Sequence, residues 1–266
     1  MKTSLYKFWK RNHLLDISAY LVLMVGLVLF ILKGAEEQGY YWQWFRIPTF
    51  LYKFDDGRFI TGPILQGLKI TLKITWISLL LTYIIGLVTA LMRLSDSLIA
   101  RGVARIYLEV SRNTPLLVQI FFMYFVAAPI LDIDRFTAGV LALSLFEGSY
   151  ASEIYRSGIV AVNKGQWEAS YTLGLSIYQS YRYIILPQAI RRILPPLTSQ
   201  AVSLIKDSSL VSVIAIYEMT MYANEIASET FLVFEIFFTI AAIYLALALI
   251  LSRIVAYFEK RYRVVS

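Results

Sequence analysis

The chain has 266 residues, of which 58% are apolar and 16% are charged, and its formal net charge is +7. Soluble globular domains carry about a quarter of charged residues, so this composition excludes an ordinary soluble protein and indicates an integral membrane protein. The Lys and Arg residues gather in short stretches between apolar runs, which is typical of cytoplasmic loops and not of a nucleic-acid-binding surface. Cysteine is absent, which excludes disulfides, Cys-based zinc sites and thiol nucleophiles.

The N-terminal region is predicted to be a retained membrane anchor. Residues 1–13 contain four basic residues and no acidic one, so we expect them in the cytoplasm. The apolar run from Leu14 to Leu32 is long enough, at about 1.5 Å per residue, to cross a hydrocarbon core of about 30 Å. No small-residue cleavage site follows it, which argues against a signal peptide. The aromatic clusters of residues 33–63 predict an amphipathic segment on the outer leaflet or, alternatively, a docking surface for a partner.

A second span is predicted from Ile64 to Leu94, and it carries a seam of hydroxyl side chains. Thr71, Thr75, Ser78 and Thr82 follow one another at spacings of four, three and four residues, so they share one helix face. Such seams usually join helices. The alternative is that the seam lines a translocation path.

The third and fourth spans are separated from the second by a basic segment. Arginines at positions 93, 101, 105 and 112 mark that segment as cytoplasmic. Thr114-Pro115 is typical of a helix start, so we expect a third span from Leu116 to Leu131 and, after a short outer turn, a fourth from Phe136 to Ile154. Glu147 lies near the middle of the fourth span. An unpaired carboxylate in hydrocarbon costs several kcal/mol, so Glu147 either contacts substrate or has a structural partner on a neighbouring helix.

Two more spans complete the predicted topology. The fifth runs from Leu197 to Tyr222, and its first half is polar enough to face protein or an aqueous cavity. The sixth runs from Phe231 to Tyr257 and is followed by a basic tail. Six spans place both termini in the cytoplasm, and both termini are basic. The candidate substrate path consists of Thr71, Thr75, Ser78, Glu147, Ser203, Lys206 and Asp207.

Between the fourth and fifth spans lies a stretch that predicts a cytoplasmic helical hairpin, Gly165 to Pro187. We expect a first helix, a reversal at Gly174, and a second helix that Pro187 ends by removing a backbone donor. The surrounding basic residues favour the cytoplasm. Rigid aromatic packing within the hairpin is expected from Trp167, Tyr171, Tyr178 and Tyr181.

This hairpin carries a resemblance to a known family. Glu168-Ala169-Ser170, followed by Gly174, Ile184 and Leu186-Pro187, resembles the EAA loop of the permease subunits of bacterial ABC importers. Ser170 stands where the family usually has Ala, which is a small change on a short helix. The resemblance covers roughly Ile64 to the C-terminus, so we expect an N-terminal segment, residues 1–63, and a permease domain, residues 64–266. Other stretches resemble the polar amino acid branch of the family: Arg112 to Gln119, Tyr150 with Glu153 and Arg156, Gly165-Gln166, and Lys206 to Leu210.

The resemblance implies an all-α protein of the bacterial inner membrane, with a five-helix core and an extra N-terminal helix. It also implies a coupling helix seated in a separate ATPase subunit, a second permease chain, identical or different, and an extracytoplasmic binding protein. That binding protein would deliver a polar amino acid such as glutamate, glutamine, arginine or histidine. The residues assigned to ATPase coupling are Gln166, Trp167, Glu168, Ala169, Ser170, Gly174 and Pro187.

The sequence also separates this reading from other classes of protein. It contains no G-x-x-x-x-G-K-[ST] phosphate loop, so we expect ATP to be bound by a partner and no cofactor or metal to be bound here. The main alternative is an ion-coupled secondary amino acid transporter, in which Glu147, Lys206 and Asp207 would relay ions; it predicts an inverted repeat, which the hydropathy does not display. A membrane-embedded enzyme is disfavoured because the single histidine, His13, lies in the basic N-terminal tail.

Overall fold

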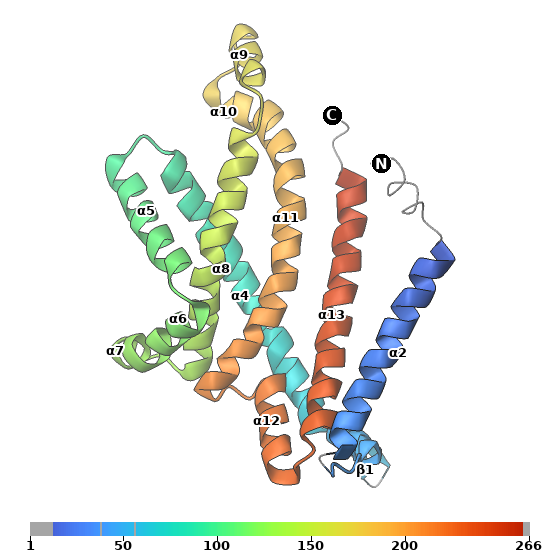
Figure 1. Cartoon of the computed structure of the whole chain (residues 1–266). Helices are drawn as coiled ribbons and strands as arrows, with labels where there is room; N and C mark the ends of the chain where they lie inside the picture. Colours follow the sequence, from blue (N-terminus) through green and yellow to red (C-terminus); the bar gives the residue numbers. More distant parts are fainter. Residues whose placement is uncertain (1–12, 38, 56, 263–266) are drawn as a thin grey trace, which may run out of the picture. The chain divides into compact units, whose positions relative to one another are not determined.

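A computed structural model describes residues 13–262 apart from residues 38 and 56. The N-terminal residues 1–12 and the last residues 263–266, whose basic side chains contributed to the predicted topology, lie outside this part of the chain. The described residues are mostly helical (Figure 1). The helices and strands are α2 (His13–Glu37), α3 (Ile47–Leu51), β1 (Tyr52–Asp55), β2 (Arg58–Thr61), α4 (Pro63–Leu94), α5 (Leu98–Asn113), α6 (Leu116–Phe122), α7 (Ala128–Leu131), α8 (Arg135–Val160), α9 (Lys164–Thr172), α10 (Ile177–Ser180), α11 (Leu186–Asp207), α12 (Met219–Thr230) and α13 (Val233–Tyr262).

The chain divides into two compact units, Met1–Trp44 and Phe45–Ser266. The first unit contains α2, in which Asp16–Ile31 is an apolar stretch, and an aromatic stack at its C-terminal end. The rings of Trp42 and Trp44 are stacked with centroids 5.9 Å apart, and Tyr40 meets Trp42 edge to face at 5.2 Å. The anchor helix expected from the sequence is therefore a helix of 25 residues.

Residues 45–63, which we expected to belong with the anchor, pack with the second unit. Ile47 of α3 is buried in a cluster with Ile64 and Met219. The strands β1 and β2 pair antiparallel, with Tyr52 opposite Thr61 and Phe54 opposite Phe59. This aromatic hairpin corrects the expectation of an all-α chain. The sequence signal was weak because the strands are only four residues long and the same aromatic residues suit an amphipathic segment at a membrane surface.

Two helices are long and apolar enough by themselves to cross a membrane, Pro63–Leu94 and Val233–Ala256. Two bent pairs pass the same test together: Leu98–Asn113 with Leu116–Leu131, bent by 110°, and Ile177–Ile214 with Met219–Thr230, bent by 51°. The described residues therefore provide two clear spans, or up to four if each bent pair counts as one. The six-span arrangement remains a prediction.

The helices α4 and α8 form the most extensive helix pair of the second unit. Their backbones approach closely at Gly86, where an added Cβ would lie 2.5 Å from the Cβ of Ala151. Nearby, the Ser78 hydroxyl donates to the Val140 carbonyl at 3.4 Å, and the Ser144 hydroxyl donates to the Ser78 carbonyl at 3.3 Å. Small and hydroxyl residues thus set the distance between these two helices.

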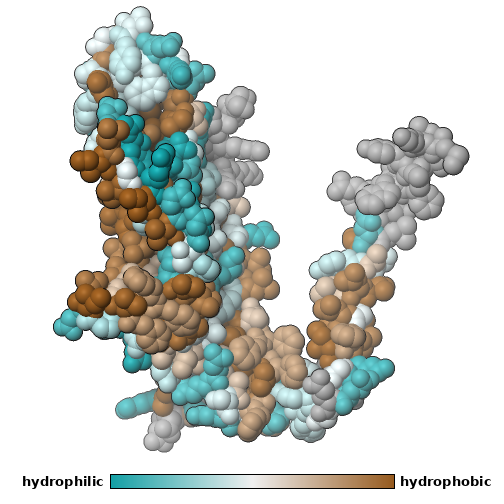
Figure 2. Space-filling view, turned by 60° about the vertical axis from the view of Figure 1, so that its left-hand side comes forward, coloured by the Kyte–Doolittle hydropathy of each residue, from teal (hydrophilic) through white to brown (hydrophobic). Residues whose placement is uncertain are grey.

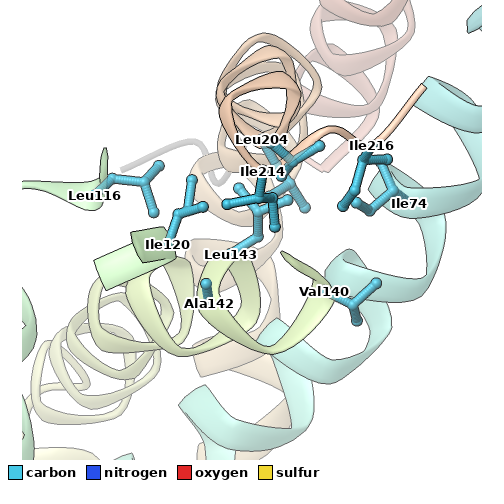
Figure 3. Packing of buried hydrophobic residues seen from close by; sticks show 10 residues of the cluster. Ile74, Leu116, Ile120, Val140, Ala142, Leu143, Leu204, Ile214 and Ile216 are labelled. Carbon is cyan, nitrogen blue, oxygen red and sulfur yellow. The ribbon is translucent and has the colours of Figure 1, made fainter. Parts of the chain in front are cut away.

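A hydrophobic cluster surrounds this pair. Leu204 and Ile214, from α11 and the 3₁₀ segment Ser208–Ile214, lie against Leu143 of α8, and Ile74 of α4 lies beside Ile216 (Figure 3). All of these side chains are at most 4% exposed. The cluster joins α4, α6, α8, α11 and the 3₁₀ segment into one body.

The third expected span, Leu116 to Leu131, is helical along its length, and it forms a bent pair with the helix before it. A π-helical segment at Met123–Ala127 joins α6 to α7 within this span. In addition, residues 98–113 form a full helix, α5, that the sequence reading treated only as a basic loop. Its polar and apolar residues lie on opposite faces, which is typical of an amphipathic helix with one face exposed to water. The bend between α5 and α6 lies at Thr114-Pro115, because proline disfavours a helical conformation at the residue before it.

The helix α11 begins earlier than the fifth expected span, and it ends inside that span. The helix α11 runs straight through Pro195 and Pro196, which we expected to precede the span. Packing of Ala189, Ile193 and Leu197 against α8 holds this part helical, so tertiary contacts override the low helix propensity of proline. The chain leaves the 3₁₀ segment at Ala215, whose φ of 56° is left-handed, and α12 starts four residues later.

The close approach of α4 to α8 generates a stability prediction. The substitution Gly86→Ala should lower the free energy of unfolding by about 1–3 kcal/mol, because its Cβ has no room beside Ala151. The matched control is Gly102→Ala on α5, where no heavy atom lies within 4 Å of an added Cβ. Thermal unfolding in detergent should place Gly86→Ala below the wild type and Gly102→Ala at or above it. Equal melting temperatures for the two variants would contradict the packing assignment.

Candidate functional site: the α9–α10 hairpin and the polar helix interfaces

The second unit carries a helical hairpin that projects from one end of the bundle (Figure 1, top). The Asn163 side chain caps α9 by accepting a hydrogen bond from the Gly165 N–H at 2.8 Å. The reversal occurs at Gly174, whose φ of 72° falls in the left-handed region that favours glycine. A capping box between Ser176 and Gln179 then starts α10. The predicted order of helix, tight turn and helix is what the structure contains, and the two caps are details that the sequence reading did not use.

Aromatic contacts join the two halves of the hairpin. Trp167 meets Tyr181 edge to face, with ring centroids 4.8 Å apart, and lies 6.5 Å from Tyr171. Trp167 and Ile184 also pack against the buried cluster that connects α8 with α11. Tyr178, which we expected to take part, is 70% exposed. Three of the four expected aromatic residues therefore stiffen the hairpin, and the fourth projects into solvent.

Polar contacts anchor the hairpin to α8 and α11. The Gln188 amide donates to the Gln166 side chain at 3.2 Å, and Arg192 donates to the Ala161 carbonyl at the end of α8. Ser170 is completely buried, and its hydroxyl donates to the Trp167 carbonyl at 2.7 Å. A serine fits here because its hydroxyl is satisfied within its own helix.

Pro187 does not end the second half of the hairpin, which corrects the sequence reading. The helical path continues from α10 through a π-helical turn, Tyr181–Ile185, into α11. In that turn the Leu186 N–H bonds to the Tyr181 carbonyl, five residues earlier. The wider turn accommodates a proline at the start of the next helix, where the missing N–H is tolerated.

The remaining coupling candidates lie on the exposed surface of the hairpin. Gln166, Glu168 and Ala169 are exposed, whereas Trp167 is half-buried. The Glu168 side chain thus presents a carboxylate to solvent, next to the small side chain of Ala169. Such a surface offers a charge and a close-contact position to a partner.

The hydroxyl seam of α4 is buried between helices. The exposed fractions of Thr71, Thr75 and Ser78 are 0%, 7% and 0%. Ser78 faces α8, as described above, and the Thr71 hydroxyl accepts a hydrogen bond from the Met219 N–H at 3.2 Å. This placement favours helix packing for the seam, and a role of these residues in a translocation path stays a prediction.

Glu147 has a structural partner on α11. The Gln200 side-chain amide donates to the Glu147 carboxylate at 2.7 Å and to its backbone carbonyl at 2.5 Å. Glu147 is 4% exposed and Gln200 is 7% exposed, so the pair lies inside the bundle. Asp207, at the end of α11, also interacts electrostatically with Glu147.

The other candidates on α11 are more accessible. Lys206 is exposed, and Ser203 and Asp207 are half-buried. Of the predicted path, the structure therefore brings together Glu147 and Asp207, whereas Lys206 projects to the surface. A contact between these path residues and the substrate remains a prediction.

The sequence reading missed a second buried carboxylate, Glu218. It caps α12 by accepting a hydrogen bond from the Met221 N–H, and it accepts another from the Tyr244 hydroxyl at 2.8 Å. The Thr71 hydroxyl lies 3.4 Å from the same carboxylate. Glu218 is completely buried, so it ties α4, α12 and α13 together. Its position before an apolar helical segment is a capping signal that could have been used.

An ion-pair network joins α4 to α8 at the end of the bundle near the hairpin. Arg93 pairs with Glu153 at 2.6 Å, and Arg156 pairs with the same carboxylate. The contact between Glu153 and Arg156 agrees with their i, i+3 spacing on α8. Arg93 adds a contact between helices that spacing alone cannot reveal.

These features define a class of protein. The apolar bent helices and the protruding hairpin fit a subunit of a membrane transport protein. Residues 82–264 match the family described as binding-protein-dependent transport system inner membrane component. The chain belongs to this family, and it is the permease subunit of an ABC importer.

Characterised relatives support this assignment. The chain is 40% identical over 205 residues to the glutamine transport system permease protein GlnP of Escherichia coli K12, covering 76% of this chain and 93% of that protein. It is 39% identical to the L-cystine transport system permease protein TcyB of Bacillus subtilis 168, covering 75% of this chain and 86% of that protein.

Solved structures agree with the fold. A crystal structure of an amino acid ABC transporter with histidines matches with a TM-score of 0.70 and 40% identity, covering 75% of this chain and 94% of that one. The MetNI methionine ABC transporter in an inward-facing conformation matches with a TM-score of 0.58 over 73% of this chain and 95% of that one. At 16% identity, the second likeness concerns the fold alone.

The buried pair of Gln200 and Glu147 generates a second prediction. Gln200→Leu removes the donor and leaves the Glu147 carboxylate without that bond, so it should lower the free energy of unfolding by about 1.5–3 kcal/mol. Adding Glu147→Leu removes the stranded carboxylate and should recover part of this loss. Thermal unfolding of the two single variants and the double variant measures the coupling. Strictly additive effects would contradict a direct interaction.

Proposed function

We propose that the chain is one of two permease subunits in a bacterial importer of polar amino acids, driven by a separate ATPase. The observation that carries this proposal is the α9–α10 hairpin, a stiff element that projects from the end of the bundle. In this proposal the hairpin lies in the cytoplasm and is seated in a cleft of the ATPase. The chain crosses the inner membrane six times, with both termini in the cytoplasm.

The exposed residues of the hairpin fit a docking surface for the ATPase. Glu168 offers a carboxylate to basic groups of that subunit, and Ala169 permits close contact beside it. Charge pairs at partly buried interfaces can contribute about 1.5–7 kcal/mol in favourable cases. Gln166 and Trp167 hold α9 against α11 and the second half of the hairpin, while Gly174 sets the turn and Pro187 starts the helix that enters the bundle.

The contacts behind the hairpin support the transmission of motion. The cluster formed by Val162, Ile185 and Ala189 is buried and continuous with α8 and α11. Displacing the hairpin therefore displaces two long helices with it, since packed interiors move as rigid bodies. Closure of two ATPase subunits would pull two hairpins together and switch the helices between inward and outward opening. One chain offers one hairpin, so the working pump contains a second permease chain.

The relatives support the substrate class. Their names refer to glutamine, L-cystine and nopaline, which are polar amino acids or their derivatives. We infer that an extracytoplasmic binding protein delivers such a solute to the end of the bundle opposite the hairpin. Within the bundle, Glu147 would attract an ammonium or cationic group, with Asp207 nearby, and the hydroxyls of α4 and α11 would serve the other polar groups.

The docking role of the hairpin is testable by charge reversal. Glu168→Lys should abolish copurification of the ATPase or uncouple ATP hydrolysis from uptake, because it replaces an exposed carboxylate by a cation at the proposed interface. The matched control is Glu229→Lys, an exposed residue of α12 at the opposite end of the bundle. Affinity purification and the ratio of uptake to hydrolysis in vesicles provide the readout. Normal copurification and coupling in Glu168→Lys would overturn this role.

The role of Glu147 is tested separately by Glu147→Gln, which keeps the shape of the side chain and removes its charge. Uptake of glutamate, glutamine, arginine and histidine should fall or change in relative preference. A thermal unfolding measurement controls for stability. Unchanged uptake and preference for all four amino acids would exclude Glu147 as a substrate contact.

A further inference from the structure

A polar groove follows one face of α5, and nothing described so far accounts for it. It has a volume of about 730 Å³ and is bounded by α5 together with the C-terminal end of α4. Its charged and amide-bearing lining residues are Arg93, Arg101, Arg105, Glu109, Arg112 and Asn113. We call it the α5 groove. Figure 2 displays a hydrophilic stripe between hydrophobic areas over the part of the bundle that α5 occupies.

The arginines of the groove form a ladder along the helix. Arg101, Arg105 and Arg112 are separated by four and seven residues, so they lie on one face. At about 1.5 Å per residue, the ladder extends over about 16 Å, or roughly half of a hydrocarbon core of about 30 Å. Since α5 begins at the end of the bundle that carries the hairpin (Figure 1), the ladder leads from that end toward the middle.

The arginine charges are only partly compensated by the described residues. Arg93 is paired with Glu153, whereas Arg101 makes one long contact, 3.4 Å to the Asp96 carbonyl. The structure gives Arg105 no hydrogen bond or ion pair to a described residue. Glu109 accepts from the Asn113 amide at 3.0 Å. Apart from the Arg93 pair, three arginines thus face one carboxylate.

Arg112, the innermost member, is held in place but retains binding capacity. Its guanidinium donates to the Ser149 carbonyl at 2.8 Å and lies 5.3 Å from the centre of the Tyr150 ring. Its Nε is buried and has no partner among the described residues. A buried guanidinium nitrogen without an acceptor is costly. An anion that enters the groove can accept hydrogen bonds from the outward-facing N–H groups of the Arg112 guanidinium.

This face cannot point toward lipid. Charged side chains at membrane depth face water or protein, because hydrocarbon solvates them poorly. A groove with excess positive charge and an aqueous opening concentrates anions. Among the groups that an amino acid importer must carry through its interior, the carboxylate is the one that matches this charge.

We propose that the α5 groove binds the carboxylate of the transported amino acid in the half of the membrane next to the hairpin, and that it favours acidic and neutral amino acids over cationic ones. This inference rests on the proposed function and narrows its substrate class. Arg112 is the inner carboxylate contact, and Arg105 and Arg101 form the path toward the hairpin end. Cationic side chains are disfavoured because they meet three arginines and one carboxylate.

The test measures binding to the purified complex of this chain with its second permease chain and ATPase, without the binding protein. Radiolabelled L-glutamine is the probe, and L-glutamate, L-arginine and L-glutaminamide, which lacks the α-carboxylate, are the competitors. In the wild type, L-glutamate should compete, whereas L-arginine and the amide should compete at least about tenfold less well. Absence of L-glutamine binding, or equal competition by the amide, overturns the proposal.

Two variants and a control locate the site. Arg112→Gln should weaken L-glutamine binding by about tenfold or more. Arg105→Gln should weaken it less and should improve competition by L-arginine; it breaks no described contact, so it should fold normally. Arg253→Gln removes an exposed arginine from α13 and should bind like the wild type. Unchanged binding in both groove variants overturns the proposal.

A final comparison separates solute from lipid and separates this inference from the proposed function. ATP-driven uptake is measured in phosphatidylcholine vesicles with and without phosphatidylglycerol, with the binding protein added. Groove variants that change only the dependence on phosphatidylglycerol would assign the groove to a lipid headgroup and overturn the proposal. If the wild type takes up amino acids and the groove variants do so equally well, the role of the α5 groove is contradicted and the proposed function is not. If the wild type takes up no amino acid, the proposed function itself is contradicted.

Discussion

The close contact between α4 and α8 is the interaction on which the rest of the second unit depends. Both helices must approach near Gly86 and Ala151 before the hydroxyls of Ser78 and Ser144 can reach the opposite backbone. In a membrane, apolar burial contributes little to helix association, so such small-residue contacts and buried hydrogen bonds decide which helices pair. Both α5 and α11 pack against α8. The wall of the α5 groove and the base of the hairpin are therefore parts of the same packed body.

Two buried carboxylates and one half-buried carboxylate secure the two ends and the centre of this body in different ways. Glu218 accepts hydrogen bonds from α12 and α13, Glu147 accepts from α11, and Glu153 pairs with two arginines near the hairpin. Glu218 and Glu153 receive donors from more than one position of the chain. Glu147 receives one from Gln200. A poorly solvating interior requires such partners for a carboxylate. Polar groups of this kind specify which faces of the helices meet, since an apolar contact could slide at little cost.

The sequence could predict the elements whose signals are local. The span of α4, the turn at Gly174 and the pair of Glu153 with Arg156 depend on composition or on spacing within one helix, and the structure contains them. It could not predict which partner each polar group meets across helices, such as Gln200 for Glu147 or Arg93 for Glu153. The helical path through Pro195 and Pro196 also depends on packing against α8. The α5 helix was overlooked because its arginines were interpreted as a loop signal, although their spacing places them on one face.

The π-helical turn at Tyr181–Ile185 has a geometric consequence for the hairpin. Such a turn holds one more residue than an α-helical turn, and one residue corresponds to about 100° of rotation about the helix axis. The face of α10 and the direction in which α9 leaves the bundle are therefore offset from those that an uninterrupted helix would give. If this single extra residue were missing, the docking residues would be rotated by about 100° about the helix axis and would face another direction. The lengths of the flanking helices would not change.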